Sequence, residues 1–217
     1  MSTPKWHAAN GATAPSSPSA NMEITAYPTT DIWRRDATPA GDVFNAPYIY
    51  ITTTSKNFKR LATTVTVPWK TQFDQGGLLI SFPNTASSEP DKACRWIKAG
   101  IELFEGKPAL GVVGTDRFSD WSLAPMPRGA GGEEGDQRTA RFEAVRDGTT
   151  LWVYVVVGGE RQALREVKWA FLDEGEDGNG VEMKLGVYAA KPTPNMGDER
   201  AGVEVSFEGL EAEIEGA

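Results

Sequence analysis

The segment Ala93–Glu105 reads ACRWIKAGIELFE, and two kinds of side chain alternate along most of it. Four apolar residues share one face: Ile97, Ala99, Ile101 and Leu103. The opposite face carries an indole, an ammonium group, a gap without a side chain and a carboxylate, from Trp96, Lys98, Gly100 and Glu102. Successive side chains of a β-strand point to opposite sides. The segment therefore predicts a strand with one face in an apolar core and a polar, aromatic outer face.

Segments of the same character recur on both sides of this strand, separated by clusters of Gly, Pro, Asp and Asn. No long segment shows the apolar period of an amphipathic helix. Short strands at this spacing are typical of an all-β sandwich or barrel. The further expected strands are Met22–Tyr27, Ile32–Arg35, Tyr48–Thr53, Phe58–Val67, Gly77–Phe82, Ala109–Gly114, Thr139–Arg146, Leu151–Val157, Leu164–Leu172, Val181–Ala190 and Gly202–Glu208.

The composition restricts the chemistry that the chain can perform. Its 217 residues include 22 Lys and Arg against 30 Asp and Glu, and the net charge of −8 argues against binding to nucleic acid or an anionic membrane. The single histidine, His7, and the single cysteine, Cys94, disfavour Ser-His-Asp or Cys-His catalysis and ordinary zinc sites. We expect no bound metal and no cofactor. An active site would have to use carboxylates, Lys, Arg, Tyr, amides or an oxygen-ligated metal.

The two ends of the chain differ in character. Residues 1–20 are rich in Ala, Ser, Pro and Thr, which predicts a disordered tail, and residues 21–217 are expected to form one β-sandwich domain. The first 20 residues lack the apolar stretch of a signal peptide, and the longest apolar run, Leu151–Val157, is too short to cross a bilayer. We therefore expect a cytoplasmic protein, which a lone cysteine also favours.

Several strands and turns carry groups that suit a sugar. Sugar rings stack their apolar faces on aromatic side chains, and their hydroxyl groups pair with amides and carboxylates. The candidate ligand-binding residues are Gln75, Trp96, Lys98, Trp121, Ser122 and Tyr188. A structural interpretation is equally open for Trp96 and for Asp120, the residue before Trp121. Trp96 is either a stacking platform in a groove or an indole covered by a loop, and Asp120 either edges the groove or caps a local turn.

Four segments, in this order, resemble the regulation-of-enolase protein family: FDQGGLLI (Phe73–Ile80), WIKAGIE (Trp96–Glu102), SDWS (Ser119–Ser122) and LGVYAAKPT (Leu185–Thr193). The resemblance covers roughly residues 30–208. It implies a concanavalin A-like jelly roll, that is, a two-sheet antiparallel β-sandwich, in a family of unknown function. It also implies a cytoplasmic link to the enzyme enolase. Lys191 stands where a Ser is common in the family, and its added charge beside Tyr188 is expected to alter ligand preference.

Three functions remain open at this point. The first is a carbohydrate-binding or sugar-phosphate-binding domain without catalysis. The second is a regulatory module that binds a metabolic enzyme such as enolase. The third is a glycoside hydrolase, which needs two carboxylates about 5–10 Å apart. Glu102 and Asp120 are the catalytic pair that we would test for this third function, although the E-x-D-x-x-E pattern of laminarinase-type enzymes is missing.

Overall fold

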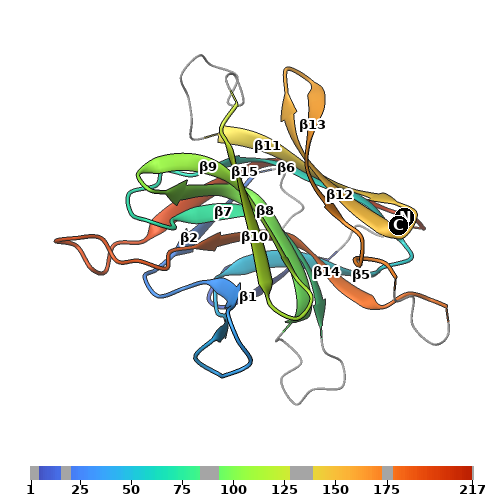
Figure 1. Ribbon diagram of the computed structural model, residues 1–217, viewed down its shortest axis with the longest axis horizontal. Coiled ribbons are helices and arrows are strands. Elements are labelled where there is room, and N and C mark those ends of the chain that lie inside the picture. Colours follow the sequence, from blue (N-terminus) through green and yellow to red (C-terminus); the bar gives the residue numbers. More distant parts are fainter. Residues whose placement is uncertain (1–4, 16–20, 84–92, 128–138, 173–177, 217) are drawn as a thin grey trace.

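The computed structural model describes residues 5–15, 21–83, 93–127, 139–172 and 178–216, and within these ranges it contains strands and no helix (Figure 1). It follows that no described segment is a helix long and apolar enough to cross a membrane. The strands are β1 (His7–Ala9), β2 (Asn21–Ala26), β3 (Ile32–Arg34), β4 (Asp42–Phe44), β5 (Tyr48–Thr54), β6 (Phe58–Thr66), β7 (Gln75–Pro83), β8 (Ala93–Phe104), β9 (Lys107–Thr115), β10 (Ser119–Pro125), β11 (Thr139–Asp147), β12 (Thr150–Val157), β13 (Glu160–Val167), β14 (Glu182–Ala190) and β15 (Val203–Ile214).

The strands form two large sheets that pack face to face (Figure 1). The seven-stranded sheet has the order β1-β5-β14-β7-β8-β9-β10, and the six-stranded sheet has the order β13-β12-β11-β6-β15-β2. Every pairing between named strands is antiparallel; for example, β7 pairs with β8 and β8 with β9. The structure thus confirms the expected all-β fold, an antiparallel two-sheet sandwich of the jelly-roll type.

The core between the sheets follows from the alternation seen in the sequence. Ile97, Ala99 and Ile101 of β8 point into it, as predicted, and so do the matching apolar faces of β7 and β14 in the same sheet. Phe58, Phe142 and several valines from the six-stranded sheet meet them from the other side. Burying one such large apolar side chain stabilises the fold by about 1.5–3 kcal/mol, so this layer supplies most of the driving force.

A second apolar cluster lies on the outer face of the seven-stranded sheet. Its sheet residues are Tyr48, Leu79, Trp96, Tyr188 and Ala190. Residues 27–47, which we call the arm, cover this cluster and contain the small β3–β4 hairpin. Ile32 and Ala46 of the arm are fully buried against the sheet, and Phe44 packs beside them. The arm therefore closes one part of the outer face and leaves the part near β8, β9 and β10 for a pocket.

Two expectations about chain segments were wrong. Part of the expected disordered tail is a strand, because β1 pairs with β5 and the His7 ring stacks on Tyr50 at 5.5 Å. Asn10 then donates a side-chain hydrogen bond to the carbonyl of Ala46, which ties this segment to the arm. The strand expected at Leu164–Leu172 lies earlier, at β13 (Glu160–Val167). Its first residues are exposed at the sheet edge, so they carry little apolar alternation.

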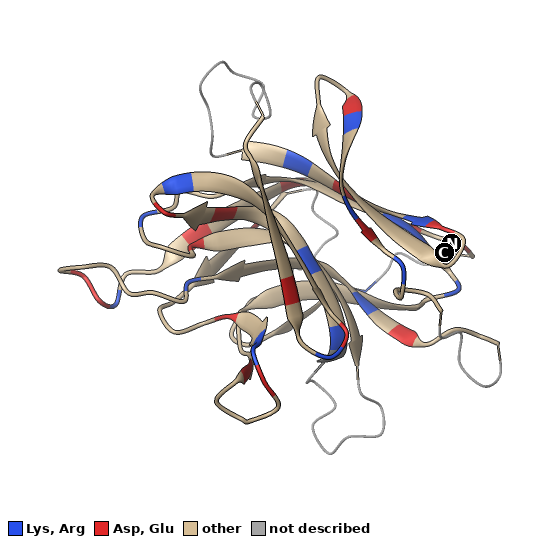
Figure 2. Ribbon diagram, in the orientation of Figure 1, with Lys and Arg blue, Asp and Glu red and all other residues tan. Residues whose placement is uncertain are grey.

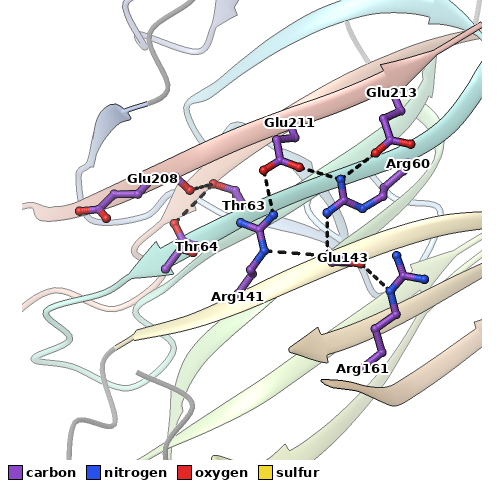
Figure 3. Close-up of polar contacts among 9 residues, drawn as sticks. All are labelled: Arg60, Thr63, Thr64, Arg141, Glu143, Arg161, Glu208, Glu211 and Glu213. Carbon is purple, nitrogen blue, oxygen red and sulfur yellow. Dashed lines mark hydrogen bonds and ion pairs between the residues drawn. The ribbon is translucent and has the colours of Figure 1, made fainter. Parts of the chain in front are cut away.

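The outer face of the six-stranded sheet is held by an ionic network (Figure 3). Arg60 on β6 pairs with Glu143 on β11 at 2.6 Å, and with Glu211 and Glu213 on β15 at 2.7 and 3.0 Å. Arg161 on β13 contacts the other oxygen of Glu143 at 2.7 Å. Burial by itself would raise the pKa of Glu143, but hydrogen bonds from Arg60 and Arg161 outweigh it and lower that pKa. The network joins four strands through charge-assisted bonds.

Candidate functional site

A pocket of about 260 Å³ opens on the outer face of the seven-stranded sheet, beside the arm. Its lining comes from the arm, from the loop before β7 and from strands β7 to β10: Asp31, Trp33, Phe73, Gln75, Lys98, Glu102, Val113 and Trp121. The strand register explains why the sheet residues meet. Gln75 lies opposite Glu102, while Lys98 lies opposite Val113, which in turn lies opposite Trp121.

A lysine that is only 3% exposed lies in the polar floor of the pocket. The Nζ atom of Lys98 donates to the side-chain oxygen of Gln75 at 2.8 Å and lies 3.4 Å from a carboxylate oxygen of Asp31. The hydroxyl of Tyr188 donates to the same Gln75 oxygen at 3.0 Å. The amide nitrogen of Gln75 donates to the carbonyl of Phe73 at 3.2 Å. Both ends of the Gln75 amide are therefore occupied, which fixes its orientation and places the Lys98 charge.

Glu102 is 8% exposed, and its burial raises the pKa of the carboxyl from 4.5 to about 7. The nearby Lys98 charge opposes this rise and the Asp31 charge adds to it. The indole N–H of Trp121 lies close enough to favour the charged carboxylate, although its geometry falls short of a full hydrogen bond. A Cβ atom at Gly111 would lie 3.1 Å from a Glu102 oxygen and 3.6 Å from the Trp121 nitrogen. Gly111 thus provides the space in which these two groups meet.

Aromatic rings form the walls of the pocket. Trp121 is in edge contact with Trp33 at 6.2 Å, with Phe73 at 6.4 Å and with Phe104 at 5.2 Å between ring centroids. Edge-to-face pairs of this kind are favourable beyond the area they bury. The rings therefore support one another, and they offer a ligand apolar surface above a polar floor.

A buried ion pair supports the loop that carries Phe73. The Nζ atom of Lys191 donates to Asp74 at 2.9 Å, to Thr71 at 2.5 Å and to the side-chain oxygen of Asn195 at 2.7 Å. Both charged side chains are fully buried. The other Asp74 oxygen accepts from the backbone of Thr71 at 3.0 Å. The expectation that Lys191 alters ligand preference directly is wrong, because its ammonium group is buried and paired with Asp74. Phe73, which precedes Asp74 in the sequence, adopts a left-handed backbone with φ of 70°.

The arm is attached to the sheet beside the pocket. The backbone N–H of Arg34 donates to the Ser119 hydroxyl on β10 at 2.8 Å, and the Arg34 guanidinium pairs with Asp42 at 3.0 Å. The same guanidinium lies 4.5 Å from the ring centre of Trp96. These contacts hold Asp31 and Trp33 of the arm against the floor.

Four of the residues expected to bind ligand or catalyse line the pocket together: Gln75, Lys98, Glu102 and Trp121. Tyr188 lies behind Gln75 and is buried, so it positions the amide rather than facing the cavity. Burial raises the pKa of the Tyr188 phenol well above its ordinary value, and the Glu102 and Asp31 charges add to this effect. Its hydroxyl therefore remains a donor.

Trp96 is not a stacking platform for a ligand, which corrects one of the two interpretations given above. Trp96 has no exposed surface, because Phe44 and Arg34 of the arm lie against its ring at 5.3 and 4.5 Å. Trp96 is a core residue of the cluster under the arm, which corresponds to the structural interpretation kept open above.

Asp120 and Ser122 were expected at the site but are not part of the pocket lining, which is a second correction. They lie on β10 at the two positions flanking Trp121, so their side chains point to the opposite side of the strand. Asp120, with 77% of its side chain exposed, pairs with Arg165 of β13. The Ser122 hydroxyl donates to the carbonyl of Val112 at 3.3 Å and accepts from Arg165 at 3.3 Å. Glu102 and Asp120, the expected catalytic pair, therefore lie on opposite faces of the sheet.

Sequence reasoning missed the residues contributed by the arm and by the loop before β7. Asp31, Trp33 and Phe73 are part of the lining, and Val113 completes it. Trp33 lies in the strand expected at Ile32–Arg35, and Phe73 lies in the segment Phe73–Ile80 that carries the family resemblance. Nothing in the sequence, however, relates Asp31 to Lys98, which lies 67 positions later. The tertiary fold alone brings these two residues together.

Charges of both signs are intermixed along the sheets and loops of the described chain (Figure 2). Among the described residues, no group of three or more His, Cys, Asp or Glu side chains is arranged to hold a metal ion. The lining of the pocket itself offers two carboxyls, one ammonium, one amide and aromatic faces.

A family described as "Protein of unknown function (DUF1349)" matches residues 6–214. The chain belongs to this family. An uncharacterized protein of Emericella nidulans is 36% identical over 180 residues, which cover 82% of this chain and 81% of that relative. Membership in a family of unknown function is thus confirmed, whereas the link to enolase remains a prediction.

Solved structures support the same fold. The crystal structure of a functionally unknown protein from Saccharomyces cerevisiae has a TM-score of 0.71 and 20% identity, and the match covers 95% of each chain. The GH43 BlXynB protein from Bacillus licheniformis has a TM-score of 0.52 and 12% identity, and the match covers 86% of this chain but 31% of that one. At these identities, the likeness concerns the fold.

Proposed function

We propose that this protein binds a small carbohydrate in the pocket beside the arm. The observation that carries the proposal is the composition of that pocket, with aromatic walls around Trp121 over a floor of Gln75, Lys98 and Glu102. Aromatic faces match the apolar C–H face of a sugar ring, and fixed amide and carboxyl groups match its hydroxyls. Because the floor is already ordered by internal hydrogen bonds, binding would cost little further ordering of these side chains.

The size of the pocket narrows the ligand. Small-molecule sites commonly measure about 300–1,000 Å³, and this one, at about 260 Å³, lies just below that range. It is suited to one sugar ring, either free or at the end of a longer chain. The ring would lie against Trp121, with its hydroxyls toward Glu102 and Lys98.

The test is a calorimetric titration of the full chain with monosaccharides and short oligosaccharides. Trp121→Ala should reduce affinity at least about tenfold, because truncating a central aromatic anchor of a binding site commonly costs about 2 kcal/mol or more and about 1.4 kcal/mol is tenfold. The matched control is Trp152→Ala. Trp152 is also half-buried, but it stacks on Tyr154 on the outer face of the other sheet. Equal affinity of the two variants, or no saturable binding of any sugar by the natural chain, would contradict the proposal.

One observation favours a second candidate, a glycoside hydrolase. Asp31 and Glu102 both line the pocket, and the pKa of Glu102 near 7 suits a carboxylic acid that donates a proton to a leaving group. Hydrolysis of aryl glycosides should then be abolished by Glu102→Gln and by Asp31→Asn. It should survive Asp120→Asn, because Asp120 faces away from the pocket. If the natural chain shows no turnover, the hydrolase candidate fails and only the binding function remains.

A further inference from the structure

The charges that line the pocket are one ammonium, from Lys98, and two carboxyls, from Asp31 and Glu102. When Glu102 is ionised, this set carries an excess negative charge. An anionic group on a ligand would face both carboxylates. The two carboxylates would repel an anionic group at this position and attract a cationic one.

Lys98 is not available to neutralise an anionic ligand. Its ammonium group already donates to Gln75 at 2.8 Å, lies 3.4 Å from Asp31 and lies 5.7 Å from the ring centre of Tyr188. Three directions around the nitrogen are thus used within the protein. A phosphate or carboxylate on a ligand would have to displace these partners.

Glu102 has the opposite character. Within the described part of the chain, no lysine or arginine nitrogen lies within 4.0 Å of its carboxylate, although the group is almost entirely buried. The indole N–H of Trp121 lies close to it but makes no full hydrogen bond. A buried carboxylate without a cation is costly. A ligand that brings a positive charge would remove this cost.

The walls add to the same preference. Trp33, Phe73 and Trp121 surround the space above Glu102. The faces of aromatic rings attract cations through their quadrupole, most strongly when water is excluded. Aromatic walls with a buried carboxylate are a suitable site for an ammonium group.

We propose that the pocket selects a sugar that carries a free amino group, with Glu102 as the counter-ion of its ammonium and the aromatic walls around the ring. This inference rests on the proposed carbohydrate-binding function and names its ligand class. It excludes sugar phosphates and sugar acids as preferred ligands.

The proposal implies a dependence on pH. The titratable groups around Glu102 are Lys98 on the same strand, Asp31 on the arm and Tyr188 on β14, whose phenol remains protonated. With a pKa of about 7, Glu102 is half ionised at pH 7.0 and about 3% ionised at pH 5.5. An amine similar to an α-amino group, with a pKa of about 7.7–8.0, stays mostly charged at both values. Affinity for the amino sugar should therefore fall about 15-fold from pH 7.0 to pH 5.5.

The experiment compares four probes by isothermal titration at pH 7.0 and pH 5.5: glucosamine, N-acetylglucosamine, glucose and glucosamine 6-phosphate. Glucosamine should bind at least about tenfold more tightly than the acetylated sugar at pH 7.0, and it alone among the unphosphorylated sugars should lose affinity at pH 5.5. Glu102→Gln should remove both the preference and the pH dependence. The control Glu105→Gln changes an exposed carboxyl in the β8–β9 turn and should leave both intact.

A second measurement guards against a variant that fails to fold. In the natural chain, carbon-13 NMR of the Glu102 carboxyl should show its apparent pKa falling when glucosamine is added. If glucose or N-acetylglucosamine binds as tightly as glucosamine and this pKa stays in place, the inference is overturned while the proposed function stands. If none of these sugars and no oligosaccharide binds, the proposed function fails, and the inference fails with it.

Discussion

Replacing Glu102 by Gln should make the protein more stable than the natural chain at pH 8 but not at pH 5. Glu102 is almost fully buried, and burial raises the pKa of its carboxyl in the folded protein from an ordinary 4.5 to about 7. Between these two values, the folded chain holds a proton that the unfolded chain has lost. Stability therefore falls as the pH rises through this window, because the folded state binds more protons than the unfolded state.

The size of the effect follows from the same two values. Each pKa unit corresponds to about 1.4 kcal/mol, so the Glu102 carboxyl weakens the fold by about 3 kcal/mol above pH 7 relative to its protonated form. Gln cannot ionise and has nearly the same shape. The difference in unfolding free energy, Glu102→Gln minus natural chain, should thus rise by about 2.5 kcal/mol between pH 5 and pH 8, because part of the total effect already lies below pH 5.

The assay is urea-induced unfolding, followed by tryptophan fluorescence at pH 5, 6, 7 and 8. Glu105→Gln is the matched control, because it removes a carboxyl that is exposed in the turn after β8. Its difference from the natural chain should stay flat over the same range. Parallel pH curves for Glu102→Gln and the natural chain would refute the reasoning, since they would mean that the Glu102 carboxyl titrates alike in the folded and unfolded states.

Three further substitutions probe other parts of the structure. Lys191→Met should lower the unfolding free energy by about 3–5 kcal/mol, because it leaves the fully buried carboxylate of Asp74 without its cation. The control Lys59→Met, at an exposed ion pair, should cost less than about 1 kcal/mol in the same urea titration. Equal losses for the two variants would contradict the prediction. Glu143→Gln should lower the unfolding free energy by about 1–3 kcal/mol at pH 7. Because the pKa of Glu143 is lowered in the folded state, this loss should shrink as the pH falls below about 4.5. A loss that stays constant with pH would argue against a stabilising role of the ionic network around Arg60. Arg34→Ala removes the cation above Trp96 and the ion pair within the arm, so amide hydrogen exchange in residues 27–47 should quicken more than in β6; unchanged exchange would show that the arm is held by other contacts.

The sheets could be predicted from the sequence because their strands alternate strictly. In β8, the apolar face of Ile97, Ala99 and Ile101 enters the core as expected. Strands with little apolar content were missed. β10, which begins at Ser119 and ends at Pro125, is mostly exposed at the edge of its sheet, so its pattern resembles a loop. The period of a sequence reports burial, and an edge strand has little of it.

The site could be predicted in part for a similar reason. Gln75, Lys98 and Glu102 stood out because polar groups on one face of buried strands are unusual. The same reasoning could not separate Trp96 from Trp121, because whether an outer face stays open depends on a segment elsewhere in the chain. The arm buries Trp96 completely, whereas at Trp121 it contributes only the edge contact of Trp33 and leaves the pocket open. Contacts between residues so far apart leave no local signal.

The position of the arm in the chain has a consequence for biosynthesis. Residues 27–47 leave the ribosome before every strand that they later cover, apart from β1, and Tyr188 of their apolar cluster emerges more than a hundred residues afterwards. Ile32 and Ala46 therefore remain without their native partners for most of translation. The Gln75 amide in the pocket floor likewise gains its Tyr188 partner only when β14 is in place, so the pocket reaches its final form late in translation, and until then the apolar side chains of the arm are accessible to chaperones.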